Sequence, residues 1–110
     1  MPDLLARPAF IRDVIARIDW LAEHRSEEQL ETFVAGLSVV RASIVRWPKA
    51  GAVVREDGRN VLRSRLFPRP LPYVVYYSHR RSGRIRGIEL VRLFGAGQER
   101  SAINMSDWPW

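Results

Sequence analysis

The hydrophobic pattern of this chain changes its period once, near Pro48. Before that proline, apolar residues recur at the i, i+3, i+4, i+7 spacing of an amphipathic helix. After it, they gather in short runs that are rich in β-branched and aromatic residues. Helices that are grouped before strands, rather than alternating with them, are typical of an α+β fold.

Two helices are expected before Pro48. The spacing predicts the first over residues 8–24. The second is expected to begin just after Ser26, because the four residues from Ser26 onward form a capping-box pattern. It is expected to end at Trp47, since a residue before proline avoids the helical region. Only a few residues join the two helices, which predicts an antiparallel helical hairpin over residues 8–47.

Three strands are expected in the second half, at about residues 60–67, 73–78 and 85–94. The Pro68-Arg69-Pro70 interruption separates the first from the second, because proline cannot donate to a strand ladder. The run Arg80-Arg81-Ser82-Gly83 is expected to form a hairpin turn.

Two further segments complete this assignment. Residues 49–58 are interpreted as a loop, because they contain Gly51 and the turn signal Asp57-Gly58. Residues 4–6 are a candidate for a short additional strand near the N-terminus.

A chain of 110 residues has room for one domain only. We therefore expect residues 1–110 to form a single α+β domain. In it, the helical hairpin (8–47) packs on one face of a three- to four-stranded antiparallel sheet (60–94), and a tail without clear periodicity (95–110) follows.

The composition excludes several classes of site and location. There is no cysteine and there are only two histidines, so we expect no disulfide, no metal site and no cofactor. Charged residues interrupt every apolar run near the N-terminus, and no stretch approaches the ~20 apolar residues of a membrane span. We expect a cytoplasmic protein without membrane contact.

Positive charge is confined to one half of the chain. Residues 1–58 hold eight Lys or Arg against nine Asp or Glu, whereas residues 59–110 hold ten Arg against three acids. The general preference for Arg over Lys has two interpretations: codon usage in a GC-rich genome, which we favour, and recognition of phosphate or carboxylate by the planar guanidinium. Codon usage does not account for the uneven placement. Such a step indicates a surface that meets an anion, either nucleic acid or an acidic segment of a protein.

Several motifs occur in the order found in one family of small bacterial proteins, and together they span roughly residues 9–101. The residues that carry them are Phe33, Trp47-Pro48 followed by Gly51, Val61-Leu62-Arg63, the strand 71–77, and the strand 88–94 with its ending Gly95 to Arg100. On these residues the chain resembles the ParE/RelE superfamily, the toxins of bacterial type II toxin–antitoxin systems.

The resemblance implies a protein that inhibits growth when it is free and is silenced by a cognate antitoxin. Such antitoxins join a ribbon-helix-helix DNA-binding domain to an extended acidic segment that wraps the toxin. Two activities divide the superfamily. RelE-like members are endoribonucleases that cut mRNA on the ribosome, and ParE-like members poison DNA gyrase without catalysis of their own.

The candidate catalytic residues that the resemblance supplies are Arg63 and Arg100, which would stabilise charge on a scissile phosphate. The tyrosine that follows the last arginine in the RNase members is absent, and so is their lysine cluster. Arginine is a poor proton donor, and His79 is interpreted as a solvated residue on the hairpin turn. The missing acid and base favour the ParE-like, non-enzymatic interpretation, with ribosome-dependent cleavage as the alternative.

Two groups of arginines are candidates for contact with a target or another anion. Arg63 and Arg65 share one face of their strand, so they can act on one anion. Four more fall within seven residues at the hairpin: Arg80, Arg81, Arg84 and Arg86. These groups leave a further alternative open, an Arg-rich nucleic-acid-binding domain whose binding would depend steeply on salt.

Two aromatic groups need burial or a partner. Tyr73 and Tyr77 share one face of their strand and Tyr76 lies on the other, and at least one of these sets is expected in the core. Trp108 and Trp110 in the tail would be costly to expose, so we expect them to pack against the sheet or a partner and take them as candidate antitoxin contacts.

Overall fold

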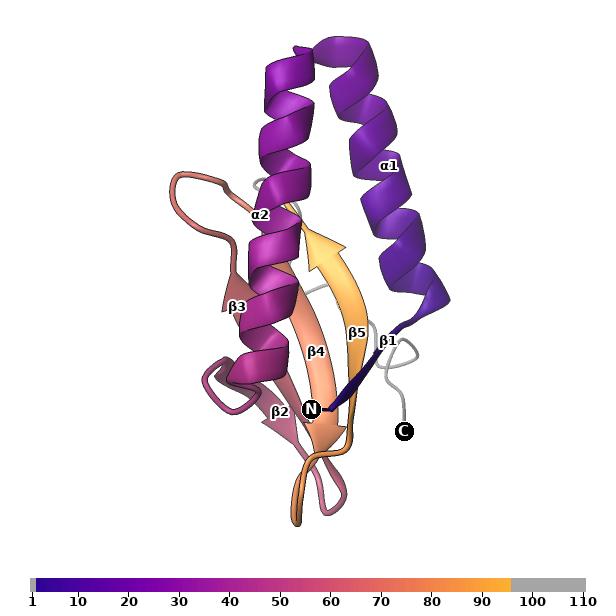
Figure 1. Ribbon diagram of the computed structural model, residues 1–110. Coiled ribbons are helices and arrows are strands. Elements are labelled where there is room, and N and C mark those ends of the chain that lie inside the picture. Colours follow the sequence, from indigo (N-terminus) through magenta and orange to yellow (C-terminus); the bar gives the residue numbers. More distant parts are fainter. Residues whose placement is uncertain (1, 96–110) are drawn as a thin grey trace.

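The computed structural model describes residues 2–95, which form two helices and five strands in the order β1-α1-α2-β2-β3-β4-β5 (Figure 1). The helices are α1 (Pro8–His24) and α2 (Glu27–Arg46). The strands are β1 (Asp3–Ala6), β2 (Ala52–Glu56), β3 (Asn60–Leu66), β4 (Val74–Arg80) and β5 (Gly87–Phe94). The α+β class predicted from the sequence is confirmed.

Local signals set the helix boundaries. Pro8 occupies the first turn of α1. At the start of α2 the Ser26 hydroxyl accepts a hydrogen bond from the Gln29 amide at 3.2 Å, and the Gln29 side chain accepts one from the Ser26 amide at 3.4 Å. Both halves of the predicted capping box are therefore present. The helix ends at Arg46, and Trp47 caps it in front of Pro48.

The expected three- to four-stranded antiparallel sheet is wrong in two respects, because the sheet has five strands and is mixed. Its order is β1-β5-β4-β3-β2. Strand β1 pairs in parallel with β5, whereas the other neighbours are antiparallel. The candidate strand at residues 4–6 is thus real, and its partner is the last strand.

The second correction concerns residues 49–58, which were expected to form a loop but contain β2. All five residues of β2 are exposed, so the strand carries no alternating pattern that a sequence could reveal. Its pairing with the edge of β3 creates it, with a register irregularity between Val53 and Arg55.

The hairpin between β4 and β5 begins later than expected. Strand β4 runs through His79 to Arg80, so the turn lies beyond Arg80. Gly83 has a φ of 81°, a conformation that glycine adopts without steric cost.

Both helices lie on one face of the sheet, with α1 packed on β5 and α2 across β3 (Figure 1). The main core fills the space between the layers. Phe33, Phe67 and Tyr73 form an aromatic group in it, with Phe33 and Tyr73 edge to face at 4.9 Å between ring centroids. Tyr77 belongs to the same core and is fully buried.

A second buried cluster lies on the opposite face, since its members on β4, Val74 and Tyr76, alternate with Val75 and Tyr77. The prediction that one set of tyrosines forms core is confirmed, and Tyr76 of the other set is buried as well. Neither helix in the described part of the chain is long and apolar enough to cross a membrane.

Candidate anion-binding site at Arg63

Arg63 lies in the middle of β3, on the face of the sheet that the helices cover. Its register partner on β4 is Tyr77, and Val61 pairs with His79 in the same ladder. Residues opposite each other in an antiparallel pair point to the same side. Arg63, Tyr77 and His79 are therefore neighbours on one face, close to the segment that leaves α2.

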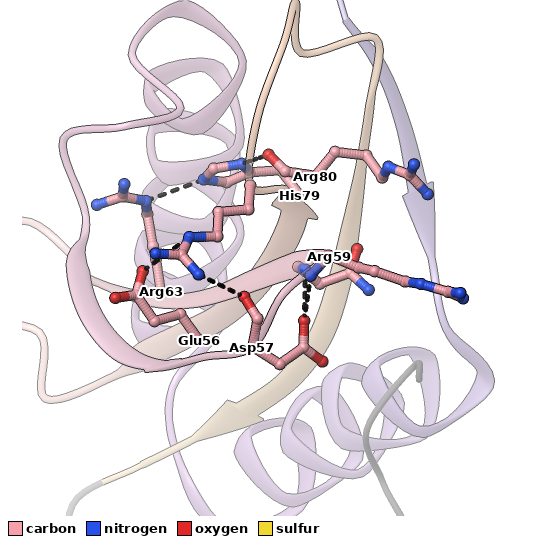
Figure 2. A network of polar contacts seen from close by, with 8 residues as sticks. Glu56, Asp57, Arg59, Arg63, His79 and Arg80 are labelled. Carbon is pink, nitrogen blue, oxygen red and sulfur yellow. Dashed lines mark hydrogen bonds and ion pairs between the residues drawn. The ribbon is translucent and has the colours of Figure 1, made fainter.

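Two neutral groups hold the Arg63 guanidinium. Its Nε donates to His79 Nε2 at 2.9 Å (Figure 2). Its Nη1 donates to the Gly51 carbonyl at 2.8 Å. Among residues 2–95, nothing accepts a hydrogen bond from its Nη2. The side chain is partly exposed. Because neither acceptor carries charge, the full positive charge of Arg63 remains available to an outside anion.

The hydrogen bonds fix the tautomer of His79. Nε2 accepts from Arg63, so the proton of the neutral ring sits on Nδ1 and is donated to the Arg80 carbonyl at 2.7 Å. Burial lowers the pKa of His79 below its usual 6.5, and the charges of Arg63 and Lys49 lower it further, against the opposing effect of the Arg80 hydrogen bond. His79 is only 4% exposed. Its interpretation as a solvated turn residue was wrong.

Tyr77 fastens the segment that follows α2 to the sheet. Its hydroxyl donates to the Pro48 carbonyl at 2.7 Å and accepts from the Gly51 amide at 3.1 Å. A Cβ at Gly51 would lie 2.4 Å from the Tyr77 oxygen and 2.8 Å from the Ser64 carbonyl, so only glycine fits. This close approach is what aims the Gly51 carbonyl at Arg63.

Two more cations act on the same site. The charges of Arg63 and Arg65 both favour ionisation of Tyr77, although burial dominates and raises its pKa above 10.0. Lys49 acts with Arg63 on His79. The predicted pairing of Arg63 and Arg65 on one strand face agrees with the register of β3, in which both residues face the α2 side.

The four arginines of the β4–β5 hairpin do not form one patch of equivalent charges. Arg81 is partly used within the fold: its Nε lies 3.9 Å from the Glu56 carboxylate, and its Nη1 donates to the Asp57 carbonyl at 3.1 Å. The other three, which are Arg80, Arg84 and Arg86, are exposed and make no ion pair within residues 2–95.

Asp57 organises the turn between β2 and β3 beside this hairpin (Figure 2). One of its carboxylate oxygens accepts from the amides of Arg59 at 2.6 Å and Asn60 at 2.7 Å. These two hydrogen bonds lower the pKa of Asp57 below 3.8. The carboxylate is thus committed to the backbone of its own turn.

Three predicted site residues lie outside the described part of the chain, namely Arg100, Trp108 and Trp110. Within residues 2–95, no three His, Asp or Glu side chains gather where they could hold a metal ion.

The arrangement is suited to holding an anion and poorly suited to proton transfer. The Nε2 lone pair of His79 is occupied by Arg63, so the ring would have to release Arg63 before it could accept a proton from a substrate. The sequence had pointed to Arg63 but not to the residues that hold it. Strand alternation would have placed His79 on the same face as Tyr77, which was the available signal.

No family model matches the chain, and a search of curated proteins finds no match either.

Proposed function

We propose that this protein is the toxin of a bacterial type II toxin–antitoxin module and acts in the ParE-like manner. In this proposal it inhibits growth by binding an essential target, for which DNA gyrase is the first candidate, and it is not itself an enzyme. The resemblance of its motifs to the ParE/RelE superfamily is the starting point, and the helical hairpin followed by antiparallel strands is compatible with it.

The observation that carries the proposal is the way Arg63 is held. An arginine that is positioned by a neutral imidazole and a carbonyl is preorganised without being neutralised. Such an arginine is a ready contact for a carboxylate or phosphate of a partner. Arg65 and Lys49 strengthen the positive potential at the same place.

The positive charge at the Arg63 site also explains how an antitoxin would bind. An acidic segment that wraps the toxin would meet this site and cover it, and the ribbon-helix-helix domain of that partner would bind DNA. Neutralisation then follows from competition, because one surface serves both the target and the antitoxin.

The second candidate function is a RelE-like endoribonuclease that acts on the ribosome. One observation favours it: a neutral histidine, the side chain most often used as a general base, touches Arg63. In this version Arg63 stabilises the phosphate and His79 moves the proton once Arg63 has turned toward the substrate.

The test is pulse-labelling after the chain alone is induced in a bacterial host, with protein and DNA synthesis followed over the first minutes. The proposal predicts that DNA synthesis falls first. Arg63→Gln should abolish growth arrest, whereas Arg69→Gln, an exposed arginine in the β3–β4 connection, removes the same charge and should leave arrest intact.

His79→Gln separates the two candidates. A glutamine side-chain oxygen can still accept from Arg63, but it cannot transfer a proton. If His79→Gln still arrests growth, the binding mode is supported. If the wild-type chain stops translation and His79→Gln does not, the enzyme is supported. Absence of any arrest by the wild-type chain, or arrest by Arg63→Gln at the wild-type level, would overturn the proposal.

A further inference from the structure

A groove of about 370 Å³ lies between the end of α2 and the β4–β5 hairpin. We call it the Trp47 groove. Its principal lining residues are Arg46, Trp47, Lys49, Arg84 and Ile85. It lies next to the Arg63 site and shares Lys49 with it, but Arg63, Tyr77 and His79 do not line it. The Pro48 and Gly51 carbonyls turn away from the groove toward the sheet, where they accept from Tyr77 and Arg63.

The indole of Trp47 is the most unusual feature of this groove. It is 56% exposed, although burial of so large a ring is favourable. The Arg46 guanidinium lies 5.3 Å from the ring centroid. An exposed aromatic ring with a neighbouring guanidinium is the arrangement on which nucleobases stack.

The charged residues in the lining are all positive. They are Arg46, Lys49 and Arg84, and none of them makes an ion pair within residues 2–95. Arg84 and Lys49 are exposed on opposite sides of the groove, one on the hairpin and the other after α2. The groove is therefore electrostatically matched to an anion.

Three backbone carbonyls beside the groove already accept hydrogen bonds. The Trp47 carbonyl accepts from the Ala50 amide at 3.0 Å, the Pro48 carbonyl accepts from Tyr77, and the Gly51 carbonyl accepts from Arg63. Among the described lining residues, every polar side-chain group is a donor: the guanidinium groups of Arg46 and Arg84, the Lys49 ammonium and the Trp47 indole N–H. An acidic peptide would bring N–H donors for which these side chains offer no acceptor. A phosphodiester backbone presents acceptors only.

We propose that the Trp47 groove binds single-stranded nucleic acid, with one base stacked on Trp47 and an adjoining phosphate held by Lys49 and Arg84. This goes beyond the toxin proposal and does not depend on it, since Trp47 and Arg84 have no role at the Arg63 site and Arg63 and His79 take no part here; Lys49 contributes to both.

The test uses the full chain and fluorescence anisotropy of labelled octanucleotides. Three probes of equal length are compared: oligo(U), oligo(dT) and an abasic deoxyribose-phosphate octamer. Loss of one stacked base weakens binding by roughly tenfold. Trp47→Ala should therefore lower the affinity for the two base-bearing probes by about that factor and leave the abasic probe unchanged. Trp47→Phe, which keeps a ring, should lose less.

The phosphate contact has its own readout. Arg84→Gln should weaken all three probes and reduce the dependence of log K on log salt by about 0.7 for the one lost phosphate contact. Arg69→Gln is the matched control, because it removes one exposed arginine at the other end of β3 and should preserve the slope.

Three results would overturn the inference. The first is equal affinity for the base-bearing and abasic probes. The second is unchanged oligonucleotide binding by Trp47→Ala and Trp47→Phe when circular dichroism shows both variants folded. The third is Trp47-dependent binding of an octaglutamate peptide without Trp47-dependent binding of oligonucleotides, which would assign the groove to an acidic protein segment.

Discussion

Arg63 and Arg92 are both partly buried arginines on the sheet, yet the fold treats them in opposite ways. Arg92 meets a carboxylate: its Nε donates to Asp13 at 2.8 Å and its Nη2 donates to the other carboxylate oxygen at 3.2 Å. Within residues 2–95, Arg63 meets only a neutral histidine and a backbone carbonyl. One guanidinium is neutralised where it stands, and the other keeps its charge.

The difference separates arginines that an ion pair neutralises from an arginine that, within residues 2–95, has only neutral acceptors. The Asp13–Arg92 pair joins α1 to β5, and Asp13 also accepts from the Leu93 amide at 2.9 Å. Arg7 and Glu89 form a similar pair between the start of α1 and β5. A bidentate ion pair neutralises the arginine within the fold. Neutral acceptors fix the position of an arginine but leave its positive potential at the surface, where it attracts anions.

The largest effect is expected from breaking the structural pair. Asp13→Ala removes the carboxylate from Arg92 and the acceptor from the Leu93 amide, while both remain partly buried. We expect the free energy of unfolding to fall by about 2 kcal/mol. Urea denaturation measures it, with Asp19→Ala, an exposed acid on the same helix, as the control that should change it by less than about 0.5 kcal/mol. An equal loss in both variants would contradict this role for Asp13.

The next effect concerns the support beneath Arg63. Tyr77→Phe leaves the Pro48 carbonyl and the Gly51 amide without their partner, and we expect a loss of about 1 kcal/mol. Hydrogen exchange at the Gly51 amide should become faster in this variant. Tyr76→Phe is the matched control, because the Tyr76 hydroxyl makes no hydrogen bond within residues 2–95 and its removal should change neither measurement.

The burial of His79 should make the stability of the fold depend on pH. The pKa of His79 is lower in the folded protein than its usual 6.5, mainly because of burial. The unfolded chain therefore binds the proton more readily, and the stability that neutral His79 contributes is complete above about pH 6.5 and is lost as the pH falls through the lower, folded value. His79→Gln should lose less stability than the wild type over this acidic range. Parallel pH profiles would show that His79 is not buried as described.

The smallest effect on stability is expected from the exposed ion pair between Arg81 and Glu56. Arg81 and Glu56 are about half exposed and 3.9 Å apart, so solvent screens their attraction. Arg81→Gln should change the free energy of unfolding by less than about 0.5 kcal/mol. A loss as large as that in Asp13→Ala would mean that exposed pairs hold this fold as firmly as partly buried ones.

The sequence located the cation of the candidate site but not its surroundings. Arg63 and Arg65 followed from strand alternation and the resemblance. His79 was misjudged because the strand was expected to end at Ser78, two residues before it does. Gly51 was interpreted as a loop signal and as part of the family motif, but not as a support for Arg63, since its closeness to Tyr77 depends on how α2 crosses the sheet.

The sequence by itself determined the features that depend on residues close together in the chain. The helix boundaries depend on a capping box, a proline and a 3.6-residue period, all of which act within a few positions. The unequal distribution of charge is likewise written in the chain.

Only the tertiary structure decided the features that depend on residues far apart in the chain. The parallel pairing of β1 with β5 joins the two ends of the described chain, and β2 exists because the edge of β3 offers it partners. The neutral cradle of Arg63 comes from Gly51 and His79, which are 12 and 16 residues away in the chain. Sheet register and helix packing bring these groups together, and neither is encoded in any local pattern.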